Sequence, residues 1–128
     1  MVAATTQSSA TLRGAVAYHA GLAAEDAVQR DYERRGQLIA ARRWRGSGGE
    51  IDLVARDGAV VIFIEVKKSG SFAQAAERVS QRQMDRIYAC ASEFLAGEPR
   101  GQDTEVRFDV ALVDAAGQIR ILENAFGC

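Results

Sequence analysis

The sequence predicts an α/β domain in which a mixed β-sheet is flanked by helices, and three observations support that fold class. Residues 60–67 (VVIFIEVK) form a near-continuous run of β-branched and aromatic residues, which is typical of a central strand buried on both faces. Helical periodicity precedes this run in residues 12–35 and follows it in residues 72–96. Short strand-like segments account for much of the rest, so helices and strands are expected to share one core.

The first predicted helix covers residues 12–35 and ends at Gly36. Small and apolar side chains recur at helical spacing on one face of this helix: Ala17, Gly21, Ala24, Val28 and Tyr32. Glu25 borders that face, and exposure to solvent is the default expectation for a glutamate in such a position.

Three strands are expected after the helix, separated by turns that contain glycine. The predicted strands are residues 37–45, 50–55 and 60–67, and the turns are residues 46–49 and 57–58. Within the second strand, strict alternation would place Ile51 and Leu53 on one face and Glu50, Asp52 and Val54 on the other.

The helical region of residues 72–96 is predicted to consist of two pieces. The break is expected near Ser80, because Ser80 and Gln83 have the spacing of a capping box. The remaining predicted elements are a loop at residues 97–103, a strand at 105–113, a turn at 115–118 and a final strand at 119–122.

The chain has 128 residues, which predicts a single domain over residues 12–128 after a disordered lead of residues 1–11. The net charge of −1 argues against strong nonspecific binding of nucleic acid. No apolar run approaches the ~20 residues of a membrane-spanning helix, and the first residues lack the apolar centre of a secretory signal. We therefore expect a cytoplasmic protein with no membrane partner.

Zinc chemistry and catalysis by a histidine-activated nucleophile are not expected. Cys90 and Cys128 have neither a CxxC neighbour nor a nearby histidine, and Cys90 fits a reduced, structural role. His19 is the only histidine and is expected on the exposed side of the first helix.

The most informative feature is Glu65-Val66-Lys67 at the end of the predicted central strand. Glu65 and Lys67 share one face, since residues two apart on a strand point the same way. Opposite charges on a largely covered face are costly to desolvate unless they have partners. A simple ion pair between the two would explain both residues without any chemistry.

Asp52 is an additional acid that this ion pair does not explain. A tight turn at residues 57–58 would place Asp52 nearly opposite Glu65, where two carboxylates repel each other. A divalent cation between them removes this conflict, and oxygen ligands of this kind suit Mg²⁺. The backbone carbonyl of Val66 could add a further oxygen. In phosphodiester cleavage, the metal would activate water and Lys67 would position that water and offset the developing charge.

The segments GEIDLVA and FIEVK together resemble the PD-(D/E)XK nuclease superfamily. Residues 21–126 resemble more closely the YraN family of small bacterial proteins, which is similar in pattern to archaeal Holliday junction resolvases. The resemblance implies a restriction-endonuclease-like core and a Mg²⁺- or Mn²⁺-dependent endonuclease that acts on DNA in repair or recombination. It also implies that Glu25 reaches the metal, directly or through water.

Two interpretations of Gln83 remain open. By resemblance, a polar side chain at this position helps to hold the substrate or the active-site lysine. Alternatively, Gln83 completes the helix cap with Ser80. Family members often carry lysine at this position, and arginine near Ser69, so both residues remove positive charge from the expected substrate channel.

Two groups of basic residues suggest a local phosphate-facing surface, although such groups are more often solvated faces. The predicted contacts with DNA are Arg43, Arg45, Lys68 and Arg82. A homodimer would suit a symmetric DNA junction. The alternative hypothesis is a nuclease-fold module that binds nucleic acid or protein without useful turnover.

Two further candidates are assigned to structure rather than to chemistry. Arg107 and Asp109 share a strand face and are expected to form a buried ion pair. Trp44 is the only tryptophan and is expected in the core, although it could contact a base.

Overall fold

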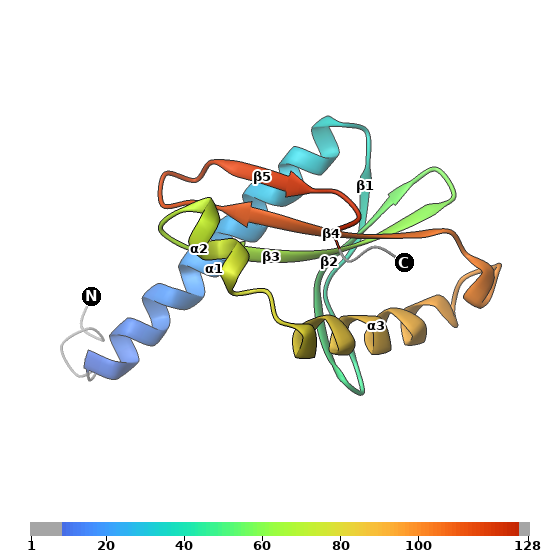
Figure 1. Ribbon diagram of the computed structural model, residues 1–128, viewed down its shortest axis with the longest axis horizontal. Coiled ribbons are helices and arrows are strands. Elements are labelled where there is room, and N and C mark those ends of the chain that lie inside the picture. Colours follow the sequence, from blue (N-terminus) through green and yellow to red (C-terminus); the bar gives the residue numbers. More distant parts are fainter. Residues whose placement is uncertain (1–8, 126–128) are drawn as a thin grey trace, which may run out of the picture.

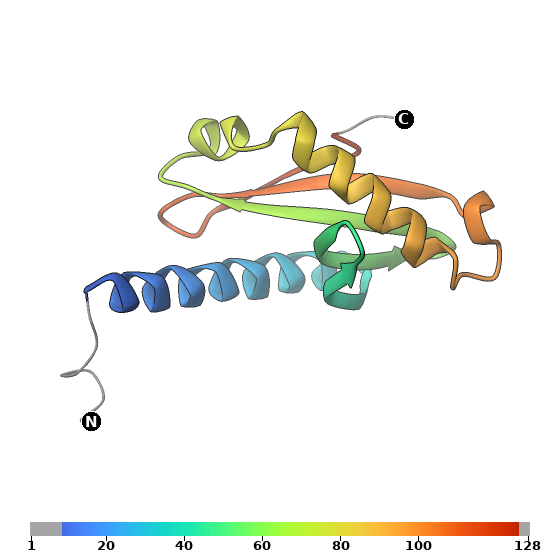
Figure 2. The ribbon, with the colours of Figure 1, turned by 90° about the horizontal axis from the view of Figure 1, so that it is seen from below.

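The computed structural model describes residues 9–125 of the chain, with side chains from residue 21 onward. A five-stranded mixed sheet is covered on one face by α1 and on the other by α2 and α3 (Figures 1 and 2). The strand order is β1-β2-β3-β4-β5, with β3 and β4 parallel and the other neighbours antiparallel. The elements in chain order are α1 (Ser9–Arg34), β1 (Leu38–Gly46), β2 (Gly49–Asp57), β3 (Val60–Lys68), α2 (Phe72–Glu77), α3 (Gln81–Leu95), the short 3-10 helix η2 (Gly101–Asp103), β4 (Val106–Val113) and β5 (Ile119–Leu122). This arrangement confirms the predicted fold class.

The first helix begins at Ser9 rather than at residue 12 and ends at Arg34, close to its predicted end. Gly36 takes a left-handed backbone conformation with φ of 83°, which a residue without a Cβ adopts at low cost. Of the expected disordered lead, residues 1–8 lie outside the described residues, while residues 9–11 belong to α1.

The central strand β3 carries the core on both of its faces, as predicted. Ile62 and Ile64 pack toward α1 with Val28 and Tyr32, in one cluster of buried side chains. Phe63 on the opposite face belongs to the cluster that packs against α3. Each fully buried side chain of this size stabilises the fold by about 1.5–3 kcal/mol. The well-packed β3 therefore gives a rigid support to the residues at its carboxyl end, among them Glu65 and Lys67.

The predicted alternation in β2 is wrong at Ile51. Ile51 packs in the α3 cluster, whereas Leu53 packs in the α1 cluster, so these residues face opposite ways. The cause lies in the partner strand, where Arg43 has a positive φ of 50°. The pairs on either side of it are Arg42 with Leu53 and Trp44 with Ile51. Both strands thus change faces at the same point, and the tip of the hairpin swings toward α3 (Figure 1).

The predicted break in the long helical region is confirmed. The hydroxyl of Ser80 accepts a hydrogen bond from the backbone N–H of Gln83 at 3.2 Å and begins α3. Ser71 caps α2 in the same way through the N–H of Gln74. Each cap satisfies an N–H group that the helix leaves unpaired.

The predicted pair of Arg107 and Asp109 is present and belongs to a larger buried network. Both carboxylate oxygens of Asp109 accept from the Arg107 guanidinium at 2.9 Å. The Tyr32 hydroxyl donates to Asp109 at 2.7 Å, and the backbone N–H of Asn124 donates to it at 2.9 Å. This network ties α1 to β4 and to the segment after β5.

The core assignments of Trp44 and Cys90 are also confirmed. Trp44 makes an edge-to-face contact with Phe94, with ring centroids 5.4 Å apart, and Cys90 is a buried free thiol. The side chain of His19 and all of Cys128 lie outside the described parts of the chain. Within those parts, no helix is both long enough and apolar enough to cross a membrane.

Candidate metal and nucleic-acid site

A fork between β2 and β3 creates the candidate site. The ladder between the two strands runs from Asp57 and Val60 to Leu53 and Ile64 and stops there. Beyond that point a side chain takes the place of the backbone partner, since Asp52 Oδ2 accepts the N–H of Val66 at 2.8 Å. Asp52 therefore stands between the separating strands, beside the strand end that carries Glu65 and Lys67.

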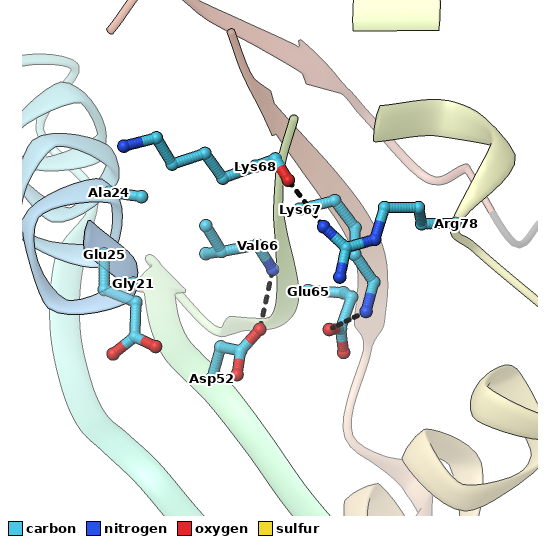
Figure 3. Close-up of a pocket in the computed structure, with 9 residues that line it drawn as sticks. All are labelled: Gly21, Ala24, Glu25, Asp52, Glu65, Val66, Lys67, Lys68 and Arg78. Carbon is cyan, nitrogen blue, oxygen red and sulfur yellow. Dashed lines mark hydrogen bonds and ion pairs between the residues drawn. The ribbon is translucent and has the colours of Figure 1, made fainter. Parts of the chain in front are cut away.

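A pocket of about 430 Å³ opens at this fork (Figure 3). It is lined by Gly21, Ala24, Glu25, Asp52, Glu65, Val66, Lys67, Lys68 and Arg78. The acidic residues come from α1, β2 and β3, and the basic residues come from the end of β3 and the segment after α2. The structure thus brings Asp52, Glu65, Lys67, Val66 and Glu25 to one pocket.

Glu65 is held from two sides at the carboxyl end of β3. Its side chain is only 6% exposed. Its Oε1 lies 3.2 Å from Lys67 Nζ and accepts a hydrogen bond from Gln83 Nε2 at 3.1 Å. The structure confirms the cap, in which the backbone N–H of Gln83 bonds to Ser80, and it places the Gln83 side chain on Glu65 rather than on Lys67.

The electrostatics of the site are dominated by the burial of Asp52. Burial, the largest cause, and the nearby charge of Glu65 together raise the pKa of its carboxyl group to about 8. The hydrogen bond from the Val66 N–H opposes this rise, and the charge of Glu25 adds a smaller increase. Two acids this close cannot both ionise at low cost, so they favour either a shared proton or a cation between them.

The donor set of this pocket fits a hard divalent cation. Asp52 Oδ2 accepts the Val66 N–H, Glu65 Oε1 accepts from Gln83, and a side-chain hydrogen bond joins the two acids. A cation that displaced the proton of this last bond would be bound by both carboxylates. One or two carboxylates are the usual protein ligands of Mg²⁺, with water and substrate phosphate completing the shell. Among the described residues, however, no three acidic, histidine or cysteine side chains are grouped closely enough to form a complete ligand set.

Glu25 lines the pocket but is engaged by arginines of β1. Its Oε1 and Oε2 accept from Arg43 Nε and Nη2 at 3.0 and 3.2 Å, and Arg42 lies 3.5 Å away. Glu25 is also buried, at 7% exposure, in contrast to the default expectation for a helix glutamate. To bind a metal directly, Glu25 would have to release at least one of these bonds.

The four predicted contacts with nucleic acid are dispersed. Lys68 lines the pocket, whereas Arg43 is bound to Glu25. Arg45 is exposed and lies 3.2 Å from Glu50, near the tip of the hairpin. Arg82 is exposed in the first turn of α3 and does not line the pocket.

Arg78 was not predicted as a site residue, although it lines the pocket. In the sequence it is only one member of the second group of basic residues, which contains Lys67, Lys68, Arg78, Arg82 and Arg86. Its location depends on a hydrogen bond from its Nη1 to the Lys68 carbonyl at 2.8 Å, and no sequence pattern predicts this contact.

Comparison with known proteins gives a consistent family assignment. A family model described as "Uncharacterised protein family UPF0102" matches residues 24–113. UPF0102 protein RSKD131_0118 of Cereibacter sphaeroides is 70% identical over 115 residues, covering 90% of this chain and 98% of the relative. UPF0102 protein SPO0400 of Ruegeria pomeroyi is 60% identical over 115 residues, covering 90% and 94%. A UPF0102 protein of Dinoroseobacter shibae is 46% identical over 112 residues, covering 88% and 84%. The chain therefore belongs to the uncharacterised UPF0102 family, the YraN family of bacterial proteins that its sequence resembles.

Proposed function

We propose that this protein is a Mg²⁺- or Mn²⁺-dependent endonuclease that hydrolyses phosphodiester bonds of DNA in the pocket at the β2–β3 fork. The observation that carries the proposal is the meeting of Asp52, Glu65 and Lys67 in one pocket of a restriction-endonuclease-like fold. A simple ion pair accounts for Glu65 and Lys67, but it does not account for a second, partly buried acid, Asp52, whose pKa is raised by desolvation and by the charge of Glu65.

Each residue has a distinct part in the proposed reaction. Asp52 and Glu65 would hold the cation, which supplies Lewis-acid polarisation of the phosphate and activation of water. Lys67 Nζ would stabilise negative charge on the phosphate oxygens and help to orient the attacking water. Gln83 acts through Glu65, since its amide fixes the orientation of that carboxylate. Glu25 would act from the pocket rim, through water or after exchange with Arg43.

The proposal extends to the substrate, the oligomeric state and the cellular compartment. The resemblance to junction resolvases motivates branched DNA of repair or recombination as the substrate, and a homodimer would match the two-fold symmetry of such a junction. Action on bacterial DNA places the protein in the cytoplasm.

The alternative is a nuclease-fold module that binds nucleic acid or a protein partner without turnover. The engagement of Glu25 favours this alternative, because the acid expected to complete the metal site is bound by two arginines instead. Such a module would bind DNA with and without a divalent metal and release no product.

The decisive experiment compares branched, duplex and single-stranded DNA as substrates in Mg²⁺, in Mn²⁺ and in chelator. Glu65→Gln and Lys67→Met are the test variants, since both keep the size of the side chain. Asp85→Asn, on the exposed face of α3, is the matched control. We expect metal-dependent cleavage by the wild type and the control and its loss in both test variants.

Metal binding is measured on the same folded samples by calorimetry. Cleavage that survives both Glu65→Gln and Lys67→Met would identify a contaminant and refute the assignment. Binding of DNA without cleavage in any metal would support the module. A folded protein that binds neither metal nor DNA would leave only the structural ion pair.

A further inference from the structure

The pocket at the fork has a basic side whose charge is only partly balanced. Its cationic side chains are Lys67, Lys68 and Arg78: Lys67 lies beside Glu65, Lys68 extends toward α1, and Arg78 lies on the other side of β3 (Figure 3). Lys67 is paired with Glu65 at 3.2 Å. Within residues 21–125, no carboxylate lies within ion-pairing distance of Lys68 or Arg78. These two residues therefore bring net positive charge to the pocket.

Other basic residues near the pocket are committed to acids. Arg43 is bound to Glu25, and Arg42 lies 2.6 Å from Asp26. A cation that is already paired attracts an incoming anion less strongly, because the carboxylate beside it offsets its charge. The positive charge open to a ligand is thus carried by Lys68 and Arg78, on either side of the end of β3, rather than by the arginines of β1.

Arg78 is fixed in place by its backbone and its side chain. It follows α2 directly, and its backbone N–H bonds to Ala75 O at 3.1 Å. Its Nη1 donates to the carbonyl of Lys68 at 2.8 Å, which ties the segment after α2 to the end of β3. A guanidinium has several further N–H donors, so this single bond positions the group and leaves donors for a ligand. Such preorganisation reduces the entropy lost on binding.

We propose that Arg78 and Lys68 form a pair of phosphate contacts, on either side of the end of β3, for the backbone of the nucleic-acid strand entering the pocket. The planar guanidinium of Arg78 can bind two oxygens of one phosphate at once, while the ammonium of Lys68 adds a point charge for a neighbouring phosphate. That these phosphates lie next to the cleaved bond rests on the proposed nuclease function. Binding of the strand itself requires neither metal nor cleavage.

The test measures binding of fluorescently labelled single-stranded and duplex DNA by anisotropy, in chelator, over about 50–200 mM salt. Arg78→Gln and Lys68→Gln are the test variants, and Arg120→Gln is the control because Arg120 is exposed on β5, outside the pocket. Each test variant should bind more weakly and lose about one unit of the slope of log K against log salt, irrespective of DNA sequence. The control should keep the wild-type slope.

Several results would overturn the pair. These are an unchanged slope in both test variants, an equal loss in Arg120→Gln, or no salt-dependent DNA binding by the wild type. Inorganic phosphate is the competing probe. Displacement of DNA at equal phosphate concentration would show that the pair binds a free anion rather than a strand.

Two further readouts separate this inference from folding and from the proposed reaction. Thermal unfolding checks each variant, and if Arg78→Gln loosens the segment after α2, Lys68→Gln still tests the pair because the side chain of Lys68 makes no such tether. Calorimetry with Mg²⁺ should give wild-type affinity in both variants. If both variants cleave DNA and keep the wild-type salt slope, the phosphate-binding pair is refuted and the nuclease proposal stands. If the wild type does not cleave DNA but the variants lose salt slope, the pair stands and the nuclease proposal is refuted.

Discussion

Arg43 donates hydrogen bonds to both carboxylate oxygens of Glu25, at 3.0 and 3.2 Å, and its own backbone is in the left-handed conformation inside β1. The pairing is bidentate and its acid is almost fully buried. The same residue thus turns the hairpin toward α3 and holds the acid at the pocket rim.

Loss of this pairing should destabilise the fold. Arg43→Asn keeps a residue that tolerates positive φ but removes the guanidinium, which leaves Glu25 buried with only Arg42 nearby. We expect the free energy of unfolding to fall by about 1–3 kcal/mol, less than for a fully buried pair because Arg43 is partly exposed. Urea unfolding measures this change. Arg45→Asn is the control, and it should stay within about 0.5 kcal/mol because Arg45 is 83% exposed. Equal effects of the two substitutions would show that the pairing of Arg43 with Glu25 does not stabilise the fold.

Stability should fall as pH rises, because the pKa of Asp52 is raised by burial and by Glu65 to about 8. In the unfolded chain the same group titrates near about 4. The folded state holds the proton over the window between these values, so the contribution of Asp52 is complete below about pH 4 and is lost as pH rises through about 8.

Two measurements check this pH dependence. The urea midpoint in chelator should decrease from about pH 6 to about pH 9, and Asp52→Asn should remove much of that decrease. Mg²⁺ should raise the wild-type midpoint more at the higher pH, where it does not compete with a proton. Parallel pH profiles of the wild type and Asp52→Asn would contradict the prediction.

The hydroxyl of Tyr32 should stabilise the fold through its bond to Asp109. Tyr32→Phe removes the 2.7 Å hydrogen bond and keeps the ring in the α1 cluster. A hydrogen bond to a charged group contributes about 1.5–3 kcal/mol, and a loss in that range is expected in urea unfolding. The same substitution in an Asp109→Asn background should cost clearly less, because the charged acceptor is gone. Equal costs in both backgrounds would show that the bond has no energetic role.

A side chain at Gly46, at the tip of the β1–β2 hairpin, should carry a small cost in stability. A Cβ there would meet the carboxylate of Glu93 and lie 3.3 Å from Cys90 Sγ. The exposed end of Glu93 can move away, but it would then lose the N–H of Ser47, which it accepts at 2.9 Å. We expect Gly46→Ala to lower the thermal midpoint slightly, with a cost of about 0.5–1.5 kcal/mol for the lost hydrogen bond. Gly48→Ala, whose Cβ would meet Ala89 at an ordinary 3.6 Å, should be nearly neutral, and the reverse ranking would contradict this contact.

The sequence was informative where a local pattern decides the structure. The apolar run of β3, the Ser80 cap and the turn after Asp57 are local signals, and the turn alone places Asp52 near Glu65. The pocket acids could therefore be found before the fold was known.

Local patterns could not reveal contacts that depend on packing between distant elements. A positive φ at Arg43 is unusual for arginine, so strict alternation misplaced Ile51. Tyr32 and Asp109 are 77 positions apart, and Arg78 reaches the pocket only because α2 docks beside the end of β3. Such contacts depend on how the elements pack in the folded protein, and no periodic pattern in the sequence predicts them.

The fork at Asp52 makes the chemistry of the site separable from the integrity of the sheet. Asp52 lies beyond the last rung of the β2–β3 ladder, so its replacement removes no backbone pairing between those strands. Asn at this position could still accept the Val66 N–H while it lacks the negative charge of the acid. If the pocket cleaves DNA as proposed, Asp52→Asn should give a well-folded protein that binds its DNA target without cleaving it, and this variant could be used to isolate that target.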